Sequence, residues 1–290
     1  MASLVLLLTV PGLAQDNNLM NLLDDEPVTE RITNAFKSPR VINTHSMEML
    51  QPGTMDLRIL HRFGEINQGG YEMWGLDQAS MRMGFDFGIT RNFMGGFGRS
   101  TSKKEFDGFL KYRILWQSTG DKNMPISLVW ASGMTINGLI DPLGIEGVPV
   151  TFSRRLGYYH ELIIGRKFND RLTIQLSPTL VHNNIVANKL APNDLFALGF
   201  GGRVKFTQRM AFVWDYTYVF NRFPPHISYN PLSIGVDIET GGHVFQLHFS
   251  NSTGMNERAF ITEANGNWFK GEIRFGFNLS RVFQIVKREL

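Results

Sequence analysis

Apolar and polar residues alternate along the stretch from Trp268 to Leu279. One parity holds aromatic and aliphatic side chains and the other holds mainly charged ones: Phe269, Ile273, Phe275, Phe277 and Leu279 against Lys270, Glu272, Arg274 and Asn278. Because successive side chains of a β-strand point to opposite faces of its sheet, this period of two predicts a strand with one apolar and one charged face.

The same alternation recurs along most of the chain. The predicted strands are Thr54–Phe63, Ser80–Thr90, Gly96–Thr101, Phe106–Trp116, Ile126–Asn137, Gly157–Lys167, Arg171–Val181, Leu195–Phe206, Met210–Phe220, Leu232–Glu239, His243–Ser250 and Trp268–Leu279. An even number of short strands, each with one apolar and one charged face, is typical of a transmembrane β-barrel. The sequence therefore predicts an all-β fold, an antiparallel up-and-down transmembrane β-barrel of about 12 strands.

The connections between these strands alternate between short and long. The short ones are Arg91–Gly95, Gln117–Pro125, Phe168–Asp170, Thr207–Arg209 and Thr240–Gly242. The long ones are Gly64–Ala79, Gly138–Leu156, His182–Asp194, Asn221–Pro231 and Asn251–Asn267. Only Ser102–Glu105 breaks this alternation. Short periplasmic turns and long extracellular loops are typical of outer-membrane barrels, so we expect the chain in the cell outer membrane, in contact with its lipid.

Ionisable residues of the predicted strands share the parity opposite to the apolar face, which places them in the lumen. They are Arg58, Arg62, Arg82, Asp86, Lys111, Arg113, Glu161, Arg203, Lys205, Asp215, Asp237, Glu239, Lys270, Glu272 and Arg274. Two interpretations follow. The lumen is a narrow channel whose basic bias favours anions, or residues of opposite sign pair across an interior that side chains largely fill.

The first residues of the chain have the pattern of a secretory signal peptide. Residues 1–15 contain no charge, an apolar run over Leu4–Val10, and small residues at Gly12 and Ala14 before a cleavage point. We therefore expect a signal peptide over 1–15, a periplasmic N-terminal segment over 16–50, the barrel over 51–282 and a C-terminal tail over 283–290.

A short amphipathic helix is predicted within the N-terminal segment. Acidic residues precede Pro27, a favourable first helical position, and Val28, Ile32 and Phe36 recur at helical spacing. We expect this helix, Asp25–Lys37, to lie outside the barrel or against its periplasmic mouth. It would act there as a plug, as a docking element for an envelope protein, or as a lid over apolar turns.

Composition limits the class of protein. Lys+Arg number 29 and Asp+Glu 26, so the charge is nearly balanced and gives no argument for binding nucleic acid. The chain has no cysteine, which excludes a lipoprotein anchor, covalently attached haem and thiolate metal sites. The counts of Phe 23 and Gly 29 suit aromatic girdles, tight turns and a crowded lumen.

Several motifs occur together in a fixed order. They are Arg40–Ser46 (RVINTHS), His61–Gly64 (HRFG), Trp74–Asp77 (WGLD), Met83–Thr90 (MGFDFGIT), Gly98–Ser100 (GRS), Asp107–Tyr112 (DGFLKY) and Phe245–Asn251 (FQLHFSN). This set resembles an outer-membrane β-barrel family of Bacteroidetes-type bacteria, a domain of unknown function (DUF5777), over about residues 30–280. The resemblance implies an outer-membrane barrel and no activity, ligand or catalytic residue.

One local pattern suggests chemistry. His248 and Ser250 precede Asn251 on a predicted strand, similar to the outer-membrane phospholipase and lipid A deacylase barrels, in which Ser and His act as nucleophile and base. Their parity turns them into the lumen, away from lipid. The seven histidines show no paired metal-ligand spacing, and we expect neither metal nor cofactor. The sequence favours a non-enzymatic barrel, either a narrow channel or an accessory subunit of an envelope complex, with a lipid hydrolase as the alternative.

Overall fold

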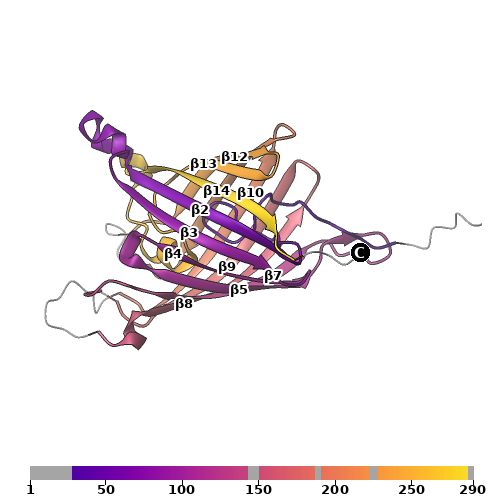
Figure 1. The fold of residues 1–290 in the computed structure, drawn as a ribbon, viewed down its shortest axis with the longest axis horizontal. Coiled ribbons are helices and arrows are strands. Elements are labelled where there is room, and N and C mark those ends of the chain that lie inside the picture. The colour runs from indigo at the N-terminus through magenta and orange to yellow at the C-terminus, as the bar shows by residue number, and fades with distance from the viewer. Residues whose placement is uncertain (1–27, 143–149, 187–190, 223–227, 287–290) are drawn as a thin grey trace, which may run out of the picture.

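The structure, a computed structural model, describes residues 28–142, 150–186, 191–222 and 228–286. Twelve antiparallel strands form a closed barrel (Figure 1). They are β2 (Thr54–Glu65), β3 (Ala79–Gly88), β4 (Phe93–Ser100), β5 (Phe106–Leu115), β7 (Ser127–Ile136), β8 (Leu156–Lys167), β9 (Leu172–Asn183), β10 (Asp194–Lys205), β11 (Met210–Val219), β12 (Leu232–Thr240), β13 (His243–Ser250) and β14 (Arg274–Gln284). The predicted fold class and strand number are confirmed.

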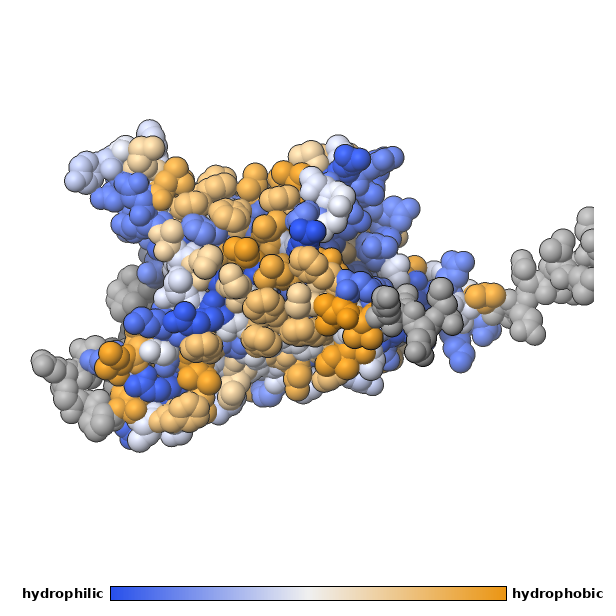
Figure 2. Space-filling view, in the orientation of Figure 1, coloured by the Kyte–Doolittle hydropathy of each residue, from blue (hydrophilic) through white to orange (hydrophobic). Residues whose placement is uncertain are grey.

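Side chains of the wall alternate between a buried inner face and an outer face, as the sequence predicts. In β2, buried and partly exposed residues alternate without interruption from Thr54 to Glu65. The most exposed large hydrophobic residues of the strands, such as Leu110, Phe196 and Tyr218, all lie on the outer parity. Figure 2 shows hydrophobic side chains over the middle of the wall and hydrophilic ones toward its ends, which is the distribution that a lipid bilayer requires.

The last strand begins later than predicted. The side chain of Asn267 accepts a hydrogen bond from the Phe269 N–H, and a 3₁₀ turn, η5 (Trp268–Lys270), follows. Gly271 then adopts the left-handed conformation, with φ at 71°, which ends the turn. The wall strand therefore starts at Arg274. The predicted placement of Lys270 and Glu272 on the lumen wall is wrong, because both belong to the connection before β14.

The barrel closes where β14 pairs with β2. The register runs from Arg274 opposite Glu65 to Gln284 opposite Thr54, with an irregularity between Arg274 and Gly276. An ion pair of 2.5 Å joins Arg274 Nη2 to Glu65 Oε1 at one end of this seam. On the outer face, His61 stacks on Phe277 with ring centroids 5.0 Å apart. The seam therefore has both polar and aromatic contacts.

The connections sort by length at the two ends of the barrel. Tight turns such as Thr240–Gly242 lie at the right in Figure 1, where the C-terminus also lies. The opposite, long-loop end has the short helices η1 (Ile66–Gln68), η2 (Gly70–Gly75), η3 (Ser102–Lys104), η4 (Phe152–Arg155) and α2 (Glu257–Thr262). No helix of the described residues is long and apolar enough to cross a membrane.

The described part of the predicted N-terminal helix is not helical, and this prediction is wrong for Val28–Lys37. The two-residue strand β1 (Glu30–Arg31) pairs there with β6 (Ser118–Thr119), at the short-turn end. The N–H groups of Ala35 and Phe36 donate to the Glu48 carboxylate, at 2.8 Å and 3.4 Å. These tertiary bonds take the place of helical ones. The predicted signal peptide over 1–15 lies outside the described residues.

Candidate functional site in the lumen

The chain before the first wall strand folds back into the barrel. We call residues 35–50 the plug hairpin; Figure 1 shows it in indigo, entering from the short-turn end. It turns at Val41–Thr44, where the Val41 N–H donates to the Thr44 carbonyl at 2.9 Å. Phe36, Ile42 and Met47 are at most 2% exposed. The predicted location of Asp25–Lys37, outside the barrel or at its mouth, therefore fits Val28–Asn34 but not Ala35 and Phe36, which are buried within the wall.

A single carboxylate of the wall holds the tip of the plug hairpin. Asp215 Oδ2, on β11, accepts the backbone N–H groups of Ile42, Asn43 and Thr44 at 3.3, 2.7 and 3.2 Å. Three converging N–H groups form a concave anion-binding site in the backbone. The turn therefore binds the wall in the way that such turns bind anions.

Other wall side chains donate to the carbonyl groups of the plug hairpin. The donors come from four strands: Lys111 Nζ to Pro39 at 3.1 Å and to Glu48 at 2.7 Å, Arg113 to Met47 at 2.5 Å, Gln175 to His45 at 2.7 Å, Gln246 to Val41 at 2.5 Å and Asn278 to Ile42 at 3.2 Å. Buried backbone carbonyls need such partners. The plug hairpin does not pair with any of the described wall strands, so side chains of the inner wall supply the hydrogen bonds that its backbone carbonyls require.

The charged residues predicted for the lumen fall into three groups. The buried group comprises Arg58, Arg62, Arg82, Asp86, Lys111, Arg113, Glu161, Arg203, Asp215, Asp237 and Arg274. Lys205 and Glu239 are partly exposed, and Glu239 pairs with Lys37 at 2.9 Å. Lys270 is exposed and Glu272 is partly exposed in the connection before β14.

Many of the buried charges have a partner of opposite sign or a plug contact. Arg82 forms a bidentate ion pair with Asp107, and Arg58 lies 3.5 Å from Asp56. Arg62 donates to the side chains of Asn43, on the plug hairpin, and Asn278, at 2.9 Å each. An ion held in a medium of low dielectric needs such compensation. This arrangement matches the interpretation in which paired residues fill the interior.

A second segment fills the lumen from the long-loop end. The connection between β13 and β14 folds inward, so Glu257, Phe260 and Ile261 of α2 are buried. Asn256 caps α2 by accepting the Ala259 N–H at 2.9 Å. Glu257 Oε1 meets Arg40 Nη1 of the plug hairpin at 2.6 Å. Two segments that enter from opposite ends therefore meet in one buried ion pair.

Three side chains with metal-ligand chemistry surround this contact. His45, Glu161 and Glu257 come from the plug hairpin, β8 and α2, and their ligand atoms lie within 4.8 Å of one another. The His45 Nε2 atom is 3.1 Å from the Tyr159 hydroxyl. However, Arg40 already pairs with Glu257, so a protein cation occupies the position beside the carboxylate. We interpret the cluster as an ion-pair centre.

The residues of the alternative hydrolase site are both buried on the inner face. His248 is 1% exposed and Ser250 is 0% exposed. The Ser250 hydroxyl oxygen accepts hydrogen bonds from Ser233 Oγ at 3.0 Å and from the Ser252 N–H at 3.2 Å. Neither ring nitrogen of His248 has a hydrogen-bond partner among the described residues. The geometry therefore pairs Ser250 with Ser233 and not with His248.

The most informative contacts were not identified from the sequence. Gln175, Gln246 and Asn278 share the inner parity, but they have no charge that marks them as lumen contacts in the sequence. The motif Arg40–Ser46 forms the tip of the plug hairpin, a role that the family resemblance does not imply. The local signal is the pair Asn43 and Thr44, residue types that suit a turn, but this signal does not say what the turn binds.

Comparisons place the chain among membrane barrels. A family model described as "Membrane bound beta barrel domain (DUF5777)" matches residues 36–283, which confirms the resemblance predicted from the motifs. No curated protein matches the chain. Similar solved structures include the NanC porin, at TM-score 0.49 and 6% identity, covering 80% of this chain and 100% of the porin. They also include the KdgM porin, at TM-score 0.46 and 8% identity, covering 79% and 99%. The outer membrane phospholipase A from Escherichia coli has TM-score 0.42 and 12% identity, covering 78% and 92%.

Proposed function

The chain belongs to this family of membrane-bound β-barrel domains, and from this premise we propose that it is a non-enzymatic outer-membrane barrel whose lumen is closed at rest by its own plug hairpin. The observation behind the proposal is the docking of the hairpin turn on Asp215. In this state the barrel is a closed accessory subunit of the envelope, with its long loops on the extracellular side.

A second candidate function is a gated channel. The interface between plug and wall combines an apolar cluster, which includes Phe36, Met47 and Ile163, with hydrogen bonds and charges at Asp215, Lys111 and Arg113. Water can solvate the polar groups of this interface if the hairpin leaves, whereas a wholly apolar interface would favour permanent closure. Once the hairpin has left, the inner wall would carry an excess of basic residues, including Arg58 and Arg62. A basic constriction favours anions.

Conductance in planar bilayers distinguishes these functions. We expect the full chain to insert silently, because side chains and the hairpin fill the lumen. The comparison variant lacks residues 28–50, so that no plug hairpin precedes β2. Discrete conductance of this variant, with anion preference, would support the gated channel. Silence of both proteins would show that α2 and the wall side chains also close the lumen, and would favour a subunit that stays closed without the hairpin.

Two further measurements distinguish a closed lumen from a barrel that has not folded, and test which residues set the ion selectivity. Heat-modifiable migration in gel electrophoresis reports whether each protein has folded into a barrel. Reversal of charge at Arg58 and Arg62 together should shift the reversal potential of the shortened variant. Steady conductance of the full chain at low voltage would contradict the proposed resting state.

A further inference from the structure

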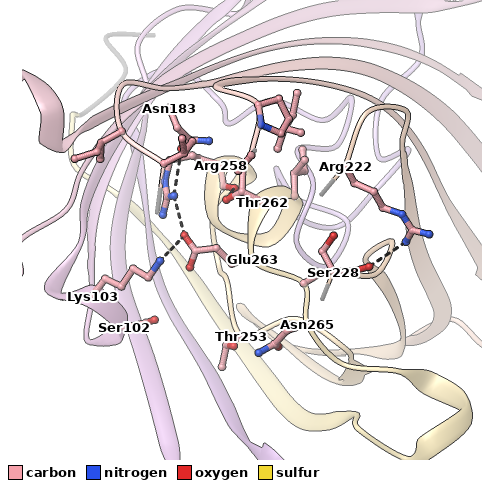
Figure 3. A pocket seen from close by; sticks show the side chains of 17 residues that line it. Ser102, Lys103, Asn183, Arg222, Ser228, Thr253, Arg258, Thr262, Glu263 and Asn265 are labelled. Atoms are coloured by element: carbon pink, nitrogen blue, oxygen red, sulfur yellow. Dashed lines mark hydrogen bonds and ion pairs between the residues drawn. The ribbon is translucent and has the colours of Figure 1, made fainter. Parts of the chain in front are cut away.

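A cavity of about 740 Å³ opens at the long-loop end of the barrel (Figure 3). Its walls come from the β4–β5, β9–β10, β11–β12 and β13–β14 connections. The buried helix α2 and the residues after it supply Arg258, Ile261 and Glu263. Volumes of about 300–1,000 Å³ are typical of small-molecule sites. The cavity therefore has the size of a site for a compact organic ligand.

Most of the charge in this cavity is already neutralised. Arg258 pairs with Glu105 and, at 2.7 Å, with Glu263, and Lys103 reaches Glu263 at 2.9 Å. Burial alone would raise the pKa of Glu263, but the charges of Arg258 and Lys103 outweigh it and lower that pKa. Two cations and two carboxylates thus form a balanced group on one side of the cavity. The dashed lines in Figure 3 mark the contacts of Glu263 with Arg258 and Lys103.

Arg222 provides a cation on the other side of the cavity. Its Nη1 donates to the Ser228 carbonyl at 3.3 Å. Within the part of the chain that the structure describes, no carboxylate forms an ion pair with it. Figure 3 shows this side chain across the cavity from the Arg258–Glu263 pair. Arg222 is partly buried, so its attraction for an anion is less screened than that of a fully exposed side chain.

The remaining lining is divided between apolar and uncharged polar groups. Ile185, Val186, Leu195 and Ile261 are among the apolar residues, and Asn265 is among the amides. An apolar lining with a few placed polar groups is the usual form of a small-molecule site. Among the described residues, the Arg222 guanidinium has no carboxylate partner, and beside this apolar surface it selects for a negative charge attached to an apolar body.

We propose that this cavity binds a small amphipathic anion, with its carboxylate or sulfonate on Arg222 and its apolar part against Ile185, Leu195 and Ile261. Arginine recognises such groups through two parallel N–H donors. A cation of the same size would be repelled by Arg222, and the one carboxylate of the described lining, Glu263, is already paired with Arg258 and Lys103. The proposal does not depend on whether the lumen ever opens.

Benzoate is a suitable probe, because it joins one carboxylate to one small ring. Its binding to the folded full chain in amphipathic polymer is measured by titration calorimetry. We expect saturable binding that weakens at least about tenfold in Arg222→Gln, as loss of one charge-assisted hydrogen bond predicts. The matched control is Arg154→Gln, which removes the same charge from an exposed outer-loop residue that does not line the cavity.

Benzyl alcohol tests the charge requirement with the same ring, and we expect it to bind at least about tenfold more weakly than benzoate. Heat-modifiable migration confirms that each variant is folded. Equal benzoate affinity in the wild type and in Arg222→Gln would overturn the proposal. So would equal affinity for benzyl alcohol, or a heat signal that does not saturate.

Discussion

Replacing Asp215 by asparagine tests whether this carboxylate keeps the plug hairpin in the lumen. The substitution preserves the shape of the side chain and one acceptor oxygen but removes the negative charge. In the native protein, one oxygen accepts the N–H groups of Ile42, Asn43 and Thr44. We expect the state with the hairpin bound in the lumen to remain the favoured one, but the hairpin should leave the lumen more often.

The magnitude follows from the geometry of these bonds. A hydrogen bond to a charged group contributes about 1.5–3 kcal/mol. Because the three N–H groups share one oxygen, we count the 2.7 Å bond from Asn43 and treat the two longer bonds as minor. The amide oxygen of asparagine still accepts a neutral hydrogen bond, worth about 0.5–1.5 kcal/mol, so the expected loss is the difference, about 1–2 kcal/mol. At about 1.4 kcal/mol per tenfold, the open population rises about 5- to 30-fold.

Cysteine labelling measures this population directly. The chain contains no cysteine, so Ser46→Cys creates a single thiol in the hairpin, at a position that is 0% exposed. A maleimide reaches this thiol only during opening, and the labelling rate is then proportional to the open population. The ratio of rates with and without Asp215→Asn gives the loss, and the effect of the cysteine itself cancels.

A matched control and a clear failure complete this test. Asp194→Asn removes the same charge at the long-loop end, where the exposed carboxylate pairs with His182 at 2.6 Å and does not touch the hairpin. We expect less than about a threefold change in that variant, the range for an exposed pair. An Asp215→Asn rate within twofold of its parent would refute the view that this carboxylate holds the hairpin.

Two further predictions concern stability. Arg40→Met and Glu257→Gln each leave a buried group without its partner, and each should lower the free energy of unfolding by about 3–5 kcal/mol. The double variant should lose less than the sum of the two single losses. Strictly additive losses, measured by urea unfolding, would show that the pair does not interact. Gly88→Ala places a Cβ against the Gln51 carbonyl where the hairpin joins the wall, and overpacking should cost about 1–3 kcal/mol. Gly108→Ala is its control, because the nearest atom to that Cβ is 3.7 Å away, and equal stability of the two variants would contradict the reasoning.

The wall could be predicted from the sequence because its physical cause is local. Alternation along each strand is set by lipid on one face and the lumen on the other, and it can be read without knowing any pairing. The start of β14 could not be read this way. Phe269 and Ile273 continue the apolar parity, but a capped turn at Asn267 and the left-handed Gly271 interrupt the strand.

The plug hairpin could not be predicted because its stability depends on distant partners. Val28, Ile32 and Phe36 fit a helical spacing, and local propensity cannot reveal that Glu48 takes the N–H groups of Ala35 and Phe36. The sequence likewise indicates only that Asp215 is one of the ionisable residues that face the lumen. Its role depends on a turn that lies far away in the sequence, since Asn43 precedes Asp215 by 172 residues.

The path of the plug hairpin has a mechanical consequence. Both of its arms leave the barrel by the short-turn end, one toward β1 and the other toward β2. A segment that passed through the lumen from one mouth to the other could not leave the closed barrel by that one mouth alone. The plug hairpin enters and leaves by the same mouth, so it can be withdrawn without opening the wall. Tension applied to the chain ahead of β1 would first meet the two-residue pairing of Glu30–Arg31 with Ser118–Thr119. After that ladder separates, the load would pass to the bonds of Ala35 and Phe36 with Glu48 and only then to the turn on Asp215, so these contacts would break in order from the mouth inward.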